Sequence, residues 1–91
     1  MTIQHDIQAG RHAPVFKYAI GEDVVASLDA AEIFDIEAST LIRASTAPDW
    51  TIGTVIDHAP SELGWLYVLR FLFGDRVHVA IVAERAIEGI A

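Results

Sequence analysis

The fold of this chain is decided by the stretch Gly64-Trp65-Leu66-Tyr67-Val68-Leu69-Arg70-Phe71-Leu72-Phe73-Gly74-Asp75-Arg76-Val77-His78-Val79-Ala80-Ile81-Val82. Two apolar runs, rich in aromatic and β-branched residues, flank the dipeptide Gly74-Asp75, which is a typical turn sequence. We therefore predict a β-hairpin over residues 64–82. Because both faces of its strands are apolar, we expect something to cover the hairpin on each side.

The first strand of this hairpin divides its side chains between two faces, since successive side chains on a strand point to opposite sides. One set is predicted to form the core: Trp65, Tyr67, Leu69 and Phe71. The other set is predicted to lie against another subunit or a partner: Leu66, Val68, Arg70 and Leu72.

Length and composition predict one small domain that associates. The chain has 91 residues, of which 53% are hydrophobic. A chain of this size buries only about two thirds of its unfolded surface, so one core does not hide that much apolar surface. We expect a homo-oligomer or a permanent protein partner. Residues 1–14 are assigned to a flexible N-terminal arm and residues 15–91 to a single small β domain.

Charge and motifs exclude several classes of function. The formal charge of −7 disfavours direct binding of nucleic acid or of an anionic membrane surface. The absence of cysteine excludes disulfides and thiolate metal sites. The sequence lacks a phosphate loop, a dinucleotide fingerprint and a nucleophile elbow, and we expect no cofactor and no metal. With no visible secretory signal and no apolar run of membrane-spanning length, we expect a soluble cytoplasmic protein.

The rest of the chain is predicted to form short strands separated by turns. Strands are expected at 23–28, at 40–44 and at 50–57, where Gly53 should mark a bulge or bend. Residues 45–49 and 58–62 read as loops. Within residues 27–44, Ser27 is a candidate helix cap, whereas the later alternation favours a strand; we expect a helical turn followed by a strand. Residues 84–88 read either as a last helical turn or as a short closing strand.

This pattern predicts a mainly β fold, as a small barrel or a compact antiparallel sheet with a short helical element, rather than a βαβ architecture.

Four pieces of the chain, in order, resemble the SH3-like small-barrel superfamily, which includes KOW and Tudor domains. They are the segment from Phe16 to Val24, the strand Ile52-Gly53-Thr54-Val55, the strand from Trp65 to Phe71, and the segment from Gly74 to Glu88. The resemblance covers about residues 15–90 and implies a small barrel, but that superfamily hosts many unrelated functions. The stretch from Ala26 to Thr51 is longer than the usual first loop, so it is either an inserted element or a sign of a different fold.

Two histidines are weighed as candidate functional groups, because histidine titrates near neutrality. His58 follows Asp57, and a carboxylate beside a histidine is a candidate general base; a loop histidine with a neighbouring acid is the commoner meaning of this pattern. His78 is expected to face an interface or solvent.

Acidic residues are in excess between Tyr18 and Ile42, where the chain contains no lysine or arginine. This excess is interpreted either as a solvated surface or as a docking face for a basic partner. The acids assigned to this acidic face are Asp29, Glu32, Asp35 and Glu37.

Together these observations favour a non-catalytic protein-interaction or assembly module, either self-associating or an accessory subunit. The residues expected to bind the partner are Trp50, Leu66, Val68, Leu72 and Phe73 as an apolar patch, with Arg70 and Arg76 as charged anchors. One alternative is an acidic inhibitor that masks a basic, nucleic-acid-binding surface. Another is a small-ligand binder or enzyme that uses His58 and Asp57.

Overall fold

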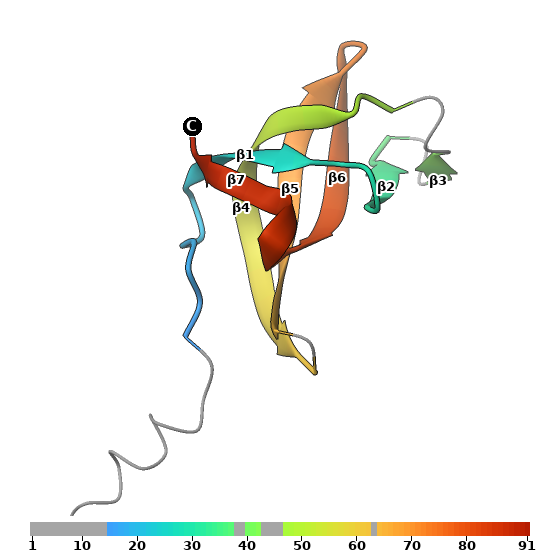
Figure 1. Cartoon of the computed structure of the whole chain (residues 1–91). Helices are drawn as coiled ribbons and strands as arrows, with labels where there is room; N and C mark the ends of the chain where they lie inside the picture. Colours follow the sequence, from blue (N-terminus) through green and yellow to red (C-terminus); the bar gives the residue numbers. More distant parts are fainter. Residues whose placement is uncertain (1–14, 38–39, 43–46, 63) are drawn as a thin grey trace, which may run out of the picture.

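The protein is described by a computed structural model that covers residues 15–37, 40–42, 47–62 and 64–91. The predicted N-terminal arm, residues 1–14, lies outside the described residues. The described chain is mainly β, as the sequence predicts, and its strands form one antiparallel sheet (Figure 1). The elements are β1 (Asp23–Ser27), β2 (Glu32–Asp35), β3 (Thr40–Ile42), β4 (Trp50–Ser61), β5 (Gly64–Phe73), β6 (Arg76–Ala83), the 3₁₀ turn η2 (Glu84–Ala86) and β7 (Ile87–Ile90). Their order in the sheet is β3-β2-β6-β5-β4-β1-β7.

The predicted hairpin is confirmed as β5 and β6, which pair from Leu66–Ala83 to Phe73–Arg76 and so along the whole of β6. Its turn residues Gly74 and Asp75 have φ angles of 61° and 65°. Positive φ at both central residues is the signature of a type I′ turn, whose twist matches that of the flanking strands.

Strand β4 is shared between two partners and is longer than expected. Residues 50–54 pair with β1, whereas residues 54–61 pair with β5. Gly53 lies at the changeover, where a Cβ atom would come within 3.2 Å of the Arg70 carbonyl oxygen, so glycine here permits a close approach of two backbones. The bulge itself falls between Val55 and Asp57. The loop expected at 58–62 is wrong for residues 58–61, because pairing with β5 keeps the chain extended through Ser61.

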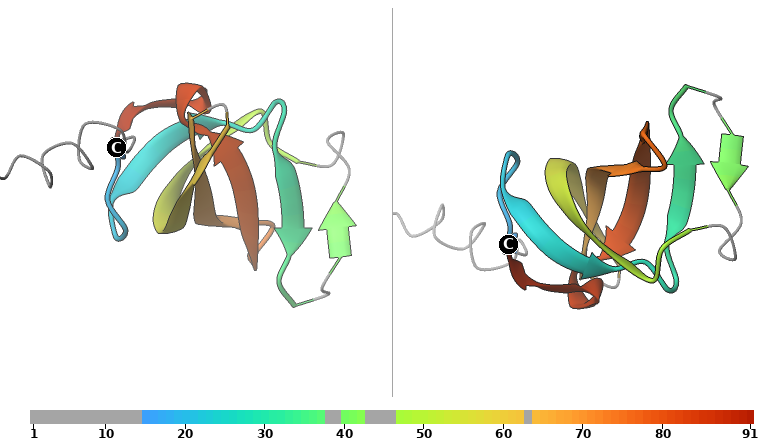
Figure 2. Two further views of the ribbon diagram at one scale, coloured as in Figure 1. Left: turned by 90° about the horizontal axis from the view of Figure 1, so that it is seen from below. Right: turned by 90° about the horizontal axis from the view of Figure 1, so that it is seen from above.

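The sheet curls so that β1 and β7 cross in front of the β5–β6 hairpin (Figures 1 and 2). The space between these two layers is the hydrophobic core. Fully buried side chains come from both layers: Val24 and Ala26 from β1, Val55 from β4, Tyr67 and Leu69 from β5, and Ala80 from β6.

Residues 27–44, for which both a helical turn and a strand were considered, contain a tight turn rather than a helical one. The chain makes a turn from Leu28 to Ala31, in which the Ala31 amide donates a hydrogen bond to the Leu28 carbonyl. The Ser27 hydroxyl accepts a second hydrogen bond from the Asp29 amide. The expected helical turn is therefore wrong, while the strand expected after it is present as β2. Serine stabilises a short turn by the same side-chain bond that it would use to cap a helix.

At the C-terminal end, both readings of residues 84–88 are partly right, since the 3₁₀ turn η2 leads directly into the closing strand β7. β7 pairs with β1, and the Ala91 amide donates to the Asp23 carbonyl. No helix within the described ranges has the length and apolar character needed to cross a membrane.

Candidate interaction surface

The alternation predicted for β5 is present. Tyr67, Leu69 and Phe71 are buried and Trp65 packs beside them, whereas Leu66 and Leu72 are 39% and 72% exposed. β6 alternates in the same way, with its odd-numbered residues half-buried on the side away from the core. We call this second side of the sheet the outer face; it comprises Glu32, Phe34, Ile52, Thr54, Asp57, Leu66, Val68, Arg70, Leu72, Val77, Val79 and Ile81.

The strand register arranges the outer face in rows. One row runs from β2 to β4 as Glu32, Ile81, Val68 and Asp57. The next row along the strands runs as Phe34, Val79, Arg70 and Thr54. The centre is therefore apolar apart from one arginine, and acids lie at both ends of one row.

The outer face is uncovered among the described elements. β1 and β7 lie on the core side of the hairpin, and no described strand crosses the opposite side (Figure 2). Near Arg70 the surface is hollowed by about 500 Å³, with Ile52, Thr54, Leu72 and Val77 around the guanidinium-bearing side chain. A second hollow of about 530 Å³, between Glu32 and Arg85, has Leu66 and Ile81 in its wall.

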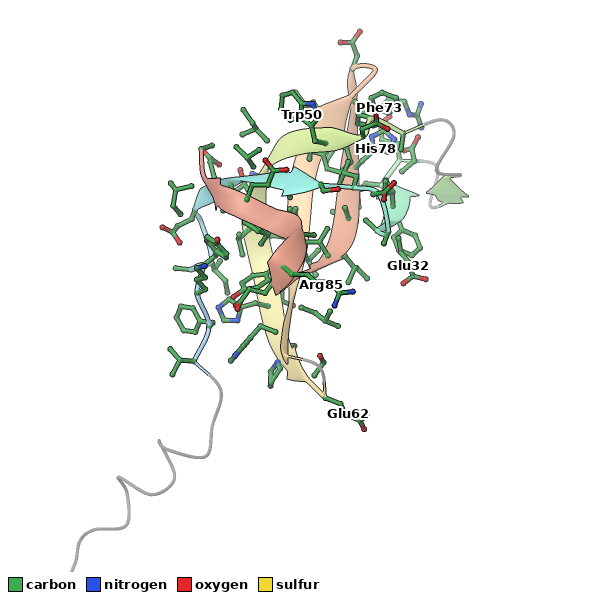
Figure 3. All side chains as sticks on the ribbon, viewed as in Figure 1. Glu32, Trp50, Glu62, Phe73, His78 and Arg85 are labelled. Atoms are coloured by element: carbon green, nitrogen blue, oxygen red, sulfur yellow. The ribbon has the colours of Figure 1, made fainter. Side chains whose placement is uncertain are left out.

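Of the two other expected patch residues, only Trp50 points outward. It is 59% exposed at the start of β4, on the same side of the strand as Ile52 and Thr54, and it pairs with Ser27 of β1. Phe73 is half-buried and meets the ring of His78 edge-on at 5.7 Å, so assigning it to the outer patch is wrong. Phe73 is an odd-numbered residue of β5, like Tyr67, Leu69 and Phe71, so its side chain points to the same side as the core residues rather than outward. Figure 3 shows Trp50 and Phe73 toward the same end of the molecule as His78.

Three expected surface groups form a cluster in which Asp35 and His78 are buried and Arg76 is exposed. Arg76 donates to Asp35 from Nε at 2.6 Å and from Nη2 at 3.1 Å, and Asp35 is only 8% exposed. His78 is 4% exposed, stacks on Phe71, and has Nε2 at 3.9 Å from the same carboxylate. The hydrogen bond with Asp35 raises the pKa of Arg76. Arg76 is therefore not a free anchor, and His78 faces neither solvent nor an interface.

The proposed acidic face is divided by the alternation of β2. Glu32 points outward, whereas Asp35 points inward to Arg76, so including Asp35 in an exposed acidic face is wrong. Asp29 and Glu37 are exposed in the turns before and after β2, and the Glu37 amide donates to Asp35. The four acids do not form one continuous surface.

The His58–Asp57 pair is separated by the sheet. Asp57 lies opposite Val68 on the outer face, whereas His58 lies opposite Tyr67 on the other side. The His58 ring stacks on Phe16 at 4.6 Å and meets Trp65 edge-on at 5.0 Å, while the Asp57 carboxylate accepts a hydrogen bond from the His58 backbone amide. The carboxylate therefore does not orient the imidazole. Within the described residues, no three His, Asp or Glu side chains converge to hold a metal ion.

Sequence reasoning did not assign Phe34, Val79 and Ile81 to the contact surface. The alternation of β6 was available as a signal for Val79 and Ile81, but the pairing of β2 beside β6 is a long-range contact with no local signature. Comparison of the chain with protein-family models, with curated proteins and with solved structures gives no match. Function is therefore inferred from the geometry of the chain itself.

Proposed function

We propose that the protein is a non-catalytic assembly module that binds another protein surface through its outer face. The observation that carries this proposal is that β5 and β6 are apolar on both faces, and only one of those faces is covered by the described chain. Isolated exposed apolar residues are common, but a contiguous apolar sheet face is a sign of an interface.

The layout of the outer face suits protein binding. Val68, Val79 and Ile81 form an apolar centre, and polar Glu32, Thr54 and Asp57 lie around it. Stable interfaces have this arrangement of an apolar core within a polar rim, and they bury about 800 Å² per partner.

An SH3-like small barrel remains our proposal for the fold family. It is supported by the curled sheet, by the central β4–β5–β6 meander, and by the 3₁₀ turn that leads into a last strand paired with the first. In this view the long stretch before β4 is an insertion, whose strands β2 and β3 extend the sheet beyond β6.

The other two functional hypotheses have less support. An acidic inhibitor that masks a basic surface needs a continuous acidic surface of its own. In β2, Asp35 and Glu32 point to opposite sides, so the acids are divided. A His58-based enzyme needs a partner for the imidazole, and Asp57 lies on the opposite side of the sheet.

The test is sedimentation velocity from low micromolar to near-millimolar concentration, with the full chain and with Val68→Asp. We expect the full chain to associate, and we expect the variant to sediment as a monomer because a carboxylate in the apolar centre would be desolvated on binding. The matched control is Ile20→Asp, which places the same charge at an exposed apolar residue in the segment before β1.

Circular dichroism must show that both variants keep the β spectrum of the full chain. Association that survives Val68→Asp overturns the proposal. A chain that stays monomeric throughout overturns self-association through this face.

A further inference from the structure

We propose that the partner of the outer face is a second copy of this chain, stacked face to face about a two-fold axis that passes over β6, with Arg70 of each copy paired to Glu32 of the other. This inference rests on the proposed function and names its partner.

The register of the sheet places the two charges symmetrically about β6. Arg70 pairs with Val79 from one side of β6, and Glu32 pairs with Ile81 from the other side. With strands about 4.8 Å apart and alternate residues about 6.8 Å apart, the two positions lie about 12 Å from each other, and their midpoint falls on β6 between Val79 and Ile81. A two-fold axis exchanges the positions of the two charges if it passes through that midpoint, lies in the plane between two stacked sheets and is perpendicular to the line that joins Arg70 and Glu32.

This axis produces a self-complementary contact. A two-fold interface uses the same patch on both copies, so each contact between unlike residues occurs twice. Here Val79 and Ile81 of the two copies meet at the centre, and an arginine–glutamate pair lies on each side of them. The apolar side chains supply the burial and the two ion pairs set the register.

Both charges are available for such a pairing. Arg70 and Glu32 are exposed, and neither forms an ion pair or side-chain hydrogen bond with another described residue. Arg76 differs from Arg70 in this respect, since Asp35 already occupies its guanidinium.

The surroundings of Arg70 indicate what it needs from a partner. Its side chain lines a hollow whose walls include Ile52, Leu72 and Val77. If an apolar surface covered this hollow, the guanidinium would lose water without gaining an acceptor, which is costly. A partner must therefore bring an acceptor to this position, and a second copy in the two-fold arrangement brings the Glu32 carboxylate.

The net charge of −7 strengthens the requirement for a defined register. Two copies repel each other overall, so stackings that place Glu32 or Asp57 against an acid of the other copy are disfavoured. The register that pairs Arg70 with Glu32 converts two of these acids into favourable contacts.

The test is a charge exchange followed by sedimentation equilibrium and native mass spectrometry. Arg70→Glu alone places acids at both positions, and Glu32→Arg alone places bases at both, so each variant should weaken its own homodimer by about tenfold or more. When the two variants are mixed, both pairs become oppositely charged again, and a heterodimer of wild-type affinity should form. The double variant R70E/E32R should restore the homodimer.

Two control variants carry the same changes of charge elsewhere. Lys17→Glu matches Arg70→Glu, and Glu62→Arg matches Glu32→Arg; Glu62 lies at the tip beyond β4 (Figure 3). Both controls should dimerise as the wild type does. If they weaken the dimer as strongly as the outer-face variants, net charge rather than pairing explains the effect and the proposal fails.

The outcomes separate this inference from the proposed function. Association that is lost in Val68→Asp but unaffected by the charge exchange, or that gives an assembly other than a dimer, leaves the outer face as the interface and overturns the two-fold pairing. Association that Val68→Asp does not change overturns both.

Discussion

Arg76, the first residue of β6, holds the carboxylate of Asp35, the last residue of β2, through two hydrogen bonds. This geometry fastens β2 to the end of the β5–β6 hairpin, at a point where the backbone pairing of the two strands ends with Asp35 and His78. Because a bidentate arginine–carboxylate contact fixes both distance and orientation, it restrains the position of β2 beside β6.

Replacing Asp35 by Asn should lower the free energy of unfolding by about 1–3 kcal/mol, because the buried position loses its charge-assisted hydrogen bonds. The measurement is urea unfolding followed by tryptophan fluorescence. Asp29→Asn is the matched control at an exposed position, and it should change stability little. Equal effects at the two positions would show that the pair with Arg76 does not stabilise the fold.

The Tyr67 hydroxyl predicts how stability depends on alkaline pH. It donates to Glu84 at 2.6 Å and accepts from the Lys17 amide at 2.9 Å, and burial followed by the bond to Glu84 raises its pKa above the ordinary 10.0. Because the pKa of Tyr67 is higher in the folded than in the unfolded protein, the protonated hydroxyl stabilises the fold fully below pH 10.0. This stabilisation is lost as the pH rises through the folded-state pKa. We expect the free energy of unfolding to fall steeply above that pH.

Tyr67→Phe isolates this effect from other groups that titrate in alkali. It should cost about 1–2 kcal/mol at neutral pH through the lost hydrogen bonds. The variant should also show a shallower alkaline decline in urea unfolding measured on both sides of pH 10. Parallel pH profiles for the two proteins would contradict this account.

Gly53→Ala should destabilise the protein by about 1–3 kcal/mol, because the added methyl group has to displace backbone. Its Cβ would approach the Arg70 carbonyl oxygen and the Leu69 Cβ, both at 3.2 Å, and neither atom belongs to a flexible side-chain end. Thr51→Ala, at a half-buried position of the same strand, serves as the comparison in thermal unfolding. A Gly53→Ala variant as stable as Thr51→Ala would show that β4 and β5 can separate at no cost.

Gly74→Val tests a conformational rather than a steric requirement. Nothing lies within 4 Å of the position of its Cβ, but its φ of 61° is unfavourable for a β-branched residue. We expect a loss of about 1–2 kcal/mol in the free energy of unfolding. An unchanged stability would mean that the turn can adopt another type without disturbing the hairpin.

Much of the hairpin could be predicted from sequence because its determinants are local. The turn dipeptide Gly74-Asp75 and the alternation of β5 both act over a few residues, so the two faces of β5 follow from periodicity alone. For the same reason, the outward positions of Leu66, Val68, Arg70 and Leu72 agree with the structure.

Several of the residues that were misplaced depend on pairing between distant segments. Nothing near Asp35 in the sequence indicates that Arg76 will meet it, and His78 is buried only because β2 pairs beside β6. His58, two residues before Pro60, was predicted to lie in a loop, yet pairing with β5 keeps it in a strand. A turn and a first helical turn use the same serine hydrogen bond at Ser27, so local chemistry does not distinguish them.

Local sequence was enough to predict a hairpin with two apolar faces and a single arginine on one face of β5, since side chains alternate along a strand whatever surrounds it. Which strands lie beside that hairpin follows from the folded arrangement of the whole chain. The order β2-β6-β5-β4 brings Glu32 and Asp57 to the two ends of one row and joins Phe34, Val79 and Ile81 to the same face. The lateral order of the strands depends on the entropy lost in closing long loops and on the burial gained in a shared core. Both terms are properties of the whole chain rather than of any one segment.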